Sequence, residues 1–209
     1  MLENEKFLAR LIAVLRSIDP KTPLPRKLEP ELRARMKKVP FSKKLLELVA
    51  QDDVPDMAFF LIAGFILVYY IDEFGEIRVT RIYDRDTIIA LDAFMSQVKS
   101  AFYIIATREA VILSITHADM LEIYKDIPEV QELALKTAAS YEKLERKRDE
   151  LMNRSNREKI LEFYNDKKEL LPPKKSPLQD KYIASYLRIK LDTFRKTRAA
   201  LRKEGLLKW

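Results

Sequence analysis

The residues best suited to a chemical task are cations near the end of the chain. Residues 153–209 hold 16 Lys and Arg against 7 Asp and Glu, a net charge of +9. Residues 1–152 hold 23 against 25, a net charge of −2. Such asymmetry points to a polyanion as the partner of the basic part. On charge alone, a solvated basic surface that aids solubility explains it equally well.

Many of these cations fall on one side of a predicted helix that runs from about Leu191 to Lys203. With Phe194 at the centre of its buried face and about 100° per residue, Arg198 and Leu201 join that face. The opposite side is polar and could reach base edges or phosphates in a DNA major groove. The predicted DNA-binding residues, with one from the preceding helix, are Lys181, Leu191, Asp192, Thr193, Arg195, Lys196 and Lys203.

These residues have different predicted roles. Arg195 and Lys196 are assigned to base edges or adjacent phosphates, and Lys181 and Lys203 to phosphates. Asp192 could accept from a cytosine amino group, or simply favour the helix N-terminus through its dipole, and both readings stay open.

The elements that must position this helix precede it directly. Residues Gln179–Arg198 have the layout of a helix-turn-helix, in which Ala184 is small where a second helix must cross closely. Arg188-Ile189-Lys190 is the predicted turn, with Ile189 tucked beneath it. Because a glycine is usual at such a turn, Arg188 is expected to take a left-handed conformation or to shift the turn.

Other kinds of chemistry have few candidate residues. The chain has no cysteine and one histidine, which excludes disulfides, cysteine-ligated metals and the usual imidazole metal sites. It offers no glycine-rich phosphate loop and no nucleophile–base set, so we expect neither an enzyme nor a cofactor. No segment resembles a signal peptide or a membrane span, and a cytoplasmic location without membrane contact is the expectation.

The middle of the chain is rich in β-branched and aromatic residues. Short strands separated by turn signals predict an antiparallel β-roll. The predicted strands are Phe59–Ala63, Phe65–Asp72, Ile77–Tyr83, Ala101–Thr107 and Ala110–Ile115. A helix over Leu2–Ile18 precedes them, followed by a proline-rich connector over Asp19–Pro30.

A long helix over Pro128–Met152 follows the strands. Apolar residues spaced by four and three form a heptad-like seam that a second copy of the helix could cover. Packing of this face against the chain's own β-roll is the alternative. The predicted dimer-interface residues are Val130, Ala134, Tyr141, Leu144 and Leu151.

Capping boxes mark two helix starts, Thr116-His117-Ala118-Asp119 and Ser155-Asn156-Arg157-Glu158. We therefore predict an α+β chain in three parts. Residues 1–126 form a helix and sensor roll, 127–153 the dimerisation helix, and 154–209 the helix-turn-helix. A complete wing hairpin does not fit after the second helix, so little or no wing is expected.

Several of these motifs resemble the Crp/Fnr family of transcription regulators. Asp180–Ile189 followed by Asp192–Lys196 is similar to that family's helix-turn-helix. Its cyclic-nucleotide-binding roll resembles Lys37-Lys38, Val54-Pro55-Asp56, Ala63-Gly64 and Tyr69–Gly75. The order and spacing over some 170 residues carry the resemblance. It implies a homodimer that binds double-stranded DNA and regulates transcription.

The chain departs from the family where cyclic nucleotides bind. Members that bind them hold the phosphate with a Gly-Glu pair and, about ten residues on, an Arg-Ser pair. The matching stretch runs from Ile88 through Asp92 to Lys99 and Ser100, with no glycine to free a backbone N–H. Asp92, Lys99 and Ser100 are the remaining candidates for a ligand site. We expect no affinity for cyclic AMP better than about millimolar, and an effector of unidentified chemistry, if there is one.

One alternative function stays open. The chain could be a ligand-binding or protein-interaction module whose helix-turn-helix no longer binds DNA. Strong retention on heparin, with elution only at high salt, would favour the DNA reading.

Overall fold

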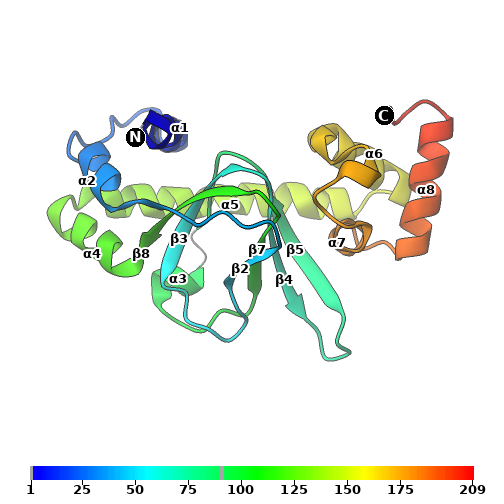
Figure 1. The fold of residues 1–209 in the computed structure, drawn as a ribbon, viewed down its shortest axis with the longest axis horizontal. Helices are drawn as coiled ribbons and strands as arrows, with labels where there is room; N and C mark the ends of the chain where they lie inside the picture. Colours follow the sequence, from blue (N-terminus) through cyan, green and yellow to red (C-terminus); the bar gives the residue numbers. More distant parts are fainter. Residues whose placement is uncertain (1, 90–91) are drawn as a thin grey trace. The chain divides into compact units, whose positions relative to one another are not determined.

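The chain forms two compact units. The computed structural model describes residues 2–89 and 92–209, with side chains for residues 4–89, 92–141 and 145–209. Unit 1 comprises Met1–Ile66 and Tyr83–Lys143, and unit 2 comprises Leu67–Ile82 and Leu144–Trp209. The long helix α5, Glu129–Met152, begins in unit 1 and ends in unit 2 (Figure 1).

Unit 1 is built on antiparallel strands. One sheet has the order β1 (Lys37–Lys38), β8 (Val111–Thr116), β3 (Met57–Ala63) and β6 (Thr87–Ile89). In the middle of β3, Phe60 lies opposite Leu113 of β8 and Ile88 of β6. A further antiparallel pair joins β2 (Leu46–Val49) to β7 (Tyr103–Ala106).

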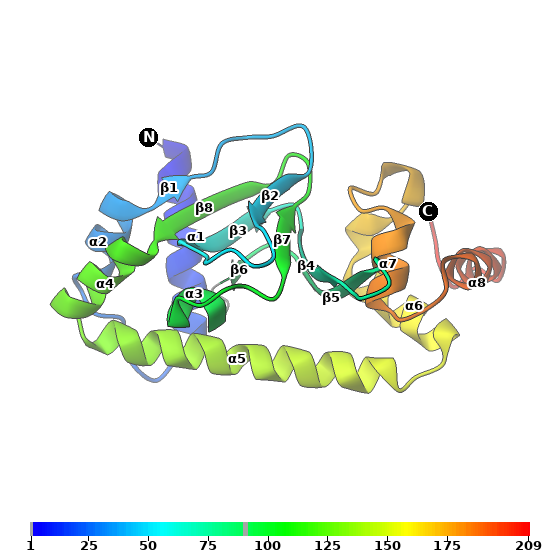
Figure 2. The ribbon, with the colours of Figure 1, turned by 90° about the horizontal axis from the view of Figure 1, so that it is seen from below.

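Helices cover one face of the β1-β8-β3-β6 sheet. They are α1 (Leu2–Ile18), α2 (Leu28–Arg35), α4 (His117–Asp126) and the first part of α5, while the short α3 spans Asp92–Ser96 (Figure 2). Leu11, Phe60, Ile115, Ile123 and Val130 come together in one buried core. This core needs no charged group, so burial of apolar surface is its main stabilising contribution.

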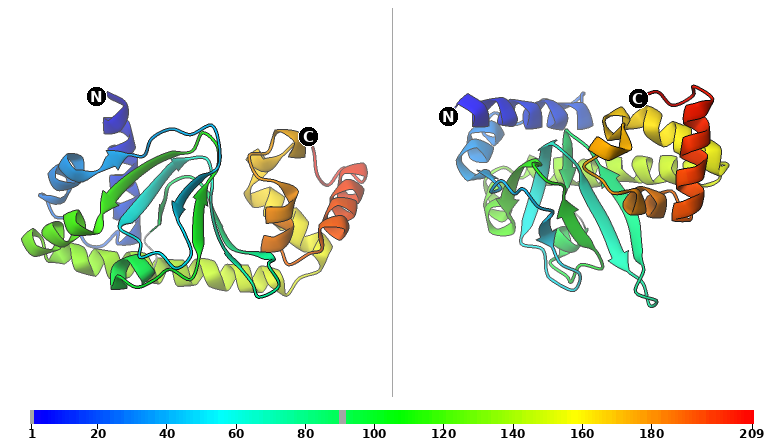
Figure 3. Two further views of the ribbon diagram at one scale, coloured as in Figure 1. Left: turned by 60° about the horizontal axis from the view of Figure 1, so that its bottom comes forward. Right: turned by 45° about the vertical axis from the view of Figure 1, so that its right-hand side comes forward.

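Unit 2 contains most of a hairpin and a cluster of helices. The hairpin joins β4 (Ile66–Ile71) to β5 (Ile77–Tyr83), and Gly75 turns it with a φ of 75° (Figure 3). After α5 come α6 (Asn156–Asp166), η1 (Lys168–Leu170), η2 (Pro173–Lys175), α7 (Asp180–Tyr186) and α8 (Leu191–Lys203). Within the described ranges no strand follows α8, and no helix is long and apolar enough to span a membrane.

The predicted α+β fold is confirmed, and so are most of its helices. The helix over Leu2–Ile18 has the predicted bounds, and the long helix starts one residue later than predicted, at Glu129. Both predicted caps are present: Thr116 Oγ1 accepts from the Asp119 N–H, and Ser155 and Glu158 form a reciprocal capping box.

The proline-rich connector was predicted too long. Residues Leu28–Arg35 form α2, and Pro30 lies in its first turn, where a missing N–H removes no helical hydrogen bond. The strands β1, β2 and β6 and the five-residue α3 were also missed, because two to five residues carry too little periodicity to be detected.

Candidate DNA-binding surface

The helix-turn-helix forms as predicted, with Leu187–Lys190 between α7 and α8. Arg188 takes the left-handed conformation, with a φ of 54°. This lets the Ile189 N–H donate back to the Ala184 carbonyl at 2.9 Å, and Ile189 is buried. Ala184 is 2% exposed, as its small side chain predicted.

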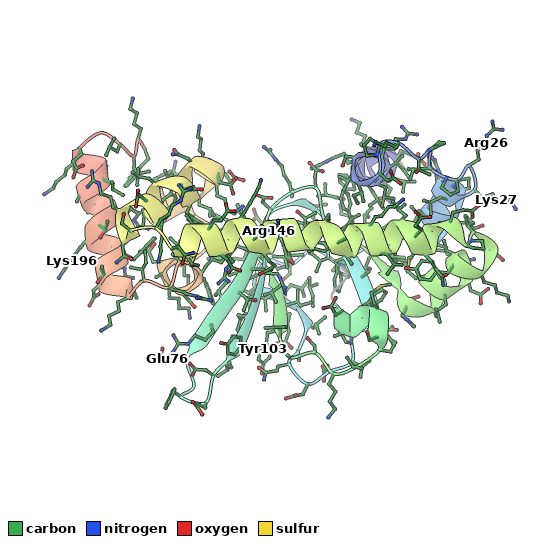
Figure 4. All side chains as sticks on the ribbon, turned by 180° about the vertical axis from the view of Figure 1, so that it is seen from behind. Arg26, Lys27, Glu76, Tyr103, Arg146 and Lys196 are labelled. Carbon is green, nitrogen blue, oxygen red and sulfur yellow. The ribbon has the colours of Figure 1, made fainter. Side chains whose placement is uncertain are left out.

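Helix α8 has one buried and one exposed side, as the helical angles predicted. Phe194, Arg198 and Leu201 are buried, and Leu191 is half-buried. The other predicted DNA-binding residues of α8 are all exposed: Asp192, Thr193, Arg195, Lys196 and Lys203. Figure 4 shows Lys196 on the outer side of the helix.

An ion pair locks α7 to α8. The Arg198 guanidinium donates to both carboxylate oxygens of Asp180, at 2.6 and 2.8 Å, and to the Tyr164 hydroxyl at 2.9 Å. It also lies over the Phe194 ring, 4.8 Å from its centroid. A two-pronged pair of this kind fixes the orientation of both side chains.

Arg195 adds a second cation to the same carboxylate. Its Nε donates to Asp180 at 3.1 Å, although the Arg195 side chain stays 55% exposed. Partial burial opposes the charged form of Asp180, but hydrogen bonds and charge from Arg198 and Arg195 outweigh it and lower the pKa of the carboxyl. Arg195 is therefore held in place while part of its guanidinium remains accessible.

Sequence reasoning missed two further exposed cations, Arg188 and Lys190 in the turn. Among the described residues, neither makes an ion pair within the chain. Lys181, at the start of α7, is exposed and lies over the ring of Tyr182 at 4.9 Å. Turn and helices together thus present a basic surface on which phosphates can bind.

The hairpin of unit 2 contacts α7 through one side chain. Ser185 Oγ donates to the Ile77 carbonyl at 2.8 Å and accepts from the Val79 N–H at 2.9 Å. These bonds join residues more than 100 positions apart, so no local pattern could have predicted them. They satisfy polar backbone groups of β5.

The predicted ligand residues differ in their exposure and in their contacts. Asp92 is exposed at the start of α3, Lys99 is exposed, and Ala90 and Leu91 lie outside the described residues. Ser100 is buried, and its hydroxyl donates to the Phe102 carbonyl and accepts from the Phe102 N–H. That hydroxyl stabilises a local turn.

The predicted dimer residues are largely used by the chain itself. Val130 is buried in the core of unit 1, and Ala134 and Tyr141 face an apolar cavity there. Leu151 is buried in unit 2, and the Leu144 side chain lies outside the described part of the chain. The open alternative, packing on the chain's own roll, applies to Val130, Ala134 and Tyr141.

No metal site accompanies this surface within the described ranges, since no three His, Asp or Glu side chains gather there. The single histidine, His117, packs edge-on against Phe94 at 5.4 Å. This is a structural contact at the start of α4.

Comparison with known proteins identifies the fold. No family model and no curated protein matches the chain. The solved structure of FixK2 from Bradyrhizobium japonicum matches with a TM-score of 0.69 and 14% identity, over 83% of this chain and 88% of its own. The catabolite activator protein of Thermus thermophilus gives 0.51 and 16%, over 94% and 90%.

A third structure carries the family name. A Eubacterium rectale protein assigned to the Crp/Fnr family of transcriptional regulators matches with a TM-score of 0.68 and 14% identity, over 89% of this chain and 87% of its own. The chain therefore has the fold of Crp/Fnr regulators, as its sequence motifs predicted.

Proposed function

We propose that the chain is a transcription regulator that binds double-stranded DNA as a homodimer on a two-fold symmetric site. The observation that carries the proposal is the division of α8, which buries Phe194, Arg198 and Leu201 and leaves Lys196 and Lys203 exposed. A helix anchored so firmly on one side can present the other to a major groove. The likeness to Crp/Fnr structures supports the same reading.

The exposed residues divide into two roles. Arg195 and Lys196 belong to the first half of α8, the part that enters the groove in a helix-turn-helix, so we assign them base-edge or neighbouring phosphate contacts. Lys181 and Lys203 are assigned to phosphates, as are Arg188 and Lys190 of the turn. The alternatives for Asp192, a cytosine contact or a helix-dipole role, both remain compatible with its exposed position.

Two substitutions test these roles. Fluorescence anisotropy would measure binding of a duplex selected from a random pool and of a scrambled duplex. Lys196→Ala should cost about 1–3 kcal/mol on the selected duplex and much less on the scrambled one. Lys203→Ala should weaken both about equally and reduce the salt slope by about one.

Lys27→Ala is the matched control, because Lys27 is equally exposed but belongs to unit 1 (Figure 4). It should bind both duplexes as the unmodified chain does. If Lys196→Ala and Lys203→Ala also leave binding unchanged, α8 is not the reading helix. The chain would then be better explained as a ligand-binding or protein-interaction module.

We further propose that residues 1–126 act as the sensor, 127–153 as the dimerisation helix and 154–209 as the DNA-binding part, working in the cytoplasm. Cyclic AMP is not the proposed effector. The reason is that the Ser100 hydroxyl is engaged with Phe102 while Asp92 and Lys99 are exposed. Among the described residues of this stretch, Asp92, Lys99 and Ser100 offer a phosphate no shared set of free donors.

A further inference from the structure

The core of unit 1 contains a cavity of about 100 Å³. It lies among α1, α2, α4 and α5 on the helix-covered side of β3. None of Asp92, Lys99 and Ser100 lines it, so it is separate from the predicted ligand residues. Protein interiors are close-packed, and a void this large loses dispersion contacts with nothing in return unless a molecule fills it.

The side chains that line this cavity disfavour a charged occupant and disfavour water. Among the described residues that line it, none is Asp, Glu, Lys, Arg or His. The hydroxyl of one lining residue, Thr137, already donates to the Leu133 carbonyl at 2.8 Å. The lining also includes Tyr124 and Tyr141, but two phenol groups among so many apolar side chains give a water molecule few of the roughly two to four polar partners that it needs.

The cavity also has room to adapt. Met36, Met95 and Met120 line it from three different segments, and methionine side chains fit occupants of varied shape. Met95 is 39% exposed, so the cavity reaches the surface at this side chain. An apolar cavity of roughly 150 Å³ holds benzene in another protein, so about one ring is the scale of occupant that methionine movement would allow here.

The deep walls of the cavity are too buried for a helix from a second copy to reach them. Leu28 and Phe60 are each 1% exposed and Leu32 is 5% exposed in the chain alone. The cavity opens toward Met95 and Ala138, which are exposed, so a partner helix could cover its mouth but could fill its deep end only by displacing α1 and α2.

We propose that this cavity binds a small, neutral, apolar molecule of about one ring or a short branched chain. Resting on the proposed function, we assign that molecule the role of effector. Six α5 residues line the cavity, Val130, Leu133, Ala134, Thr137, Ala138 and Tyr141, and α5 continues into unit 2. An occupant therefore contacts the helix that leads to the DNA-binding part.

Calorimetric titration of the whole chain with benzene tests the binding. Ala134→Leu places three further carbon atoms into the cavity, whereas Ala118→Leu makes the same change at an exposed site of α4 outside the lining. The unmodified chain and Ala118→Leu should bind benzene saturably. Ala134→Leu should bind at least about tenfold more weakly while keeping its helical circular dichroism. If Ala134→Leu fails to fold, Ala138→Leu, which also adds carbon atoms to the lining, is tested in its place.

Absence of saturable binding by the unmodified chain would overturn the proposal, and so would equal binding by the filled variants. A monomeric Ala134→Leu protein, where the unmodified chain is a dimer, would assign the cavity to a second copy instead. Binding of the selected duplex without benzene tests the proposed function separately. If benzene binds but leaves duplex affinity unchanged, the site stands and its role as effector fails.

Discussion

Asp180 shows how one carboxylate can organise the proposed DNA-binding surface without contacting DNA itself. It receives two bonds from Arg198 and one from Arg195 across the gap between α7 and α8. Arg198 is buried and has a structural role. Arg195 is oriented by the same carboxylate, but its guanidinium stays accessible to solvent. This carboxylate therefore joins α7 to α8, while Arg198 also contacts Tyr164 of α6 and Phe194 of α8.

Asp180→Asn should lower the free energy of unfolding by about 2 kcal/mol. The substitution leaves the Arg198 guanidinium, which is 10% exposed, without its counter-charge. Because the Asp180 side chain is 18% exposed, the loss of stability should be smaller than for a fully buried ion pair. Urea unfolding at neutral pH measures the change. Asp192→Asn, an exposed acid of α8, is the control and should change stability little; an equal loss there would mean that general charge matters and not the pair.

Asp180 also determines in which direction stability should change with pH. The folded pKa of Asp180 is below its ordinary value, so its contribution is present at neutral pH and is lost as pH falls below about 4 toward the folded pKa. The stability of Asp180→Asn should therefore fall less steeply in acid than that of the unmodified chain.

For single residues, the sequence predicted which side of a helix is buried better than it predicted which side chains form ion pairs or hydrogen bonds. Helical angles placed Arg198 on the buried side of α8 and Lys196 on the exposed side, and both placements are confirmed. The pairing of Arg198 with Asp180 could not be predicted, because it depends on how two helices cross. The hydrogen bond between the Val79 N–H and the Ser185 hydroxyl joins residues 106 positions apart, and no pattern in the sequence could predict it.

Among the elements, the turn between α7 and α8 carries visible backbone strain. Arg188 occupies the left-handed region at a φ of 54°, where a side chain costs roughly 1–2 kcal/mol. The Arg188 N–H donates to Ser185 and the Ile189 N–H to Ala184, and these two bonds hold the turn closed.

Arg188→Gly should raise the free energy of unfolding by about 0.5–1 kcal/mol. Relief of the strain exceeds the extra backbone entropy that glycine brings to the unfolded chain. Ala199→Gly is the matched control at an exposed position inside α8 and should cost about 1 kcal/mol. Loss of stability on Arg188→Gly would show that the arginine side chain contributes more than its backbone costs. Thermal and urea unfolding distinguish the outcomes.

Elements with clear signals were predicted well. Caps at Thr116 and Ser155 located two helix starts, and β5 has the predicted bounds. The failures have physical reasons. Pro30 marks a connector by composition, yet it is harmless in the first turn of α2. The strand β1 forms because β8 supplies its hydrogen-bond partners. A sequence of two residues cannot reveal such a distant pairing.

For the whole molecule, the proposed homodimer needs a side of α5 that a second copy can cover. Val130 is buried in unit 1 and Leu151 in unit 2, so these two apolar side chains are already covered in the single chain. Leu135, by contrast, is 67% exposed, and Ala138 and Ala139 one turn later are exposed too. Residues three and four apart share a helix face, so these three form one apolar strip that two helices could share closely.

Leu135→Glu should therefore shift the homodimer toward monomer. In a two-fold interface the substitution meets its own copy, so two like charges replace an apolar contact. Size-exclusion chromatography with light scattering over a dilution series measures the shift, and duplex binding should weaken in parallel because two half-sites no longer act together. Leu121→Glu, 50% exposed on α4, is the control and should leave the dimer intact. A Leu135→Glu protein that remains a dimer at the lowest concentration would place the interface away from this side of α5, whereas a monomeric unmodified chain would contradict the two-fold operator itself.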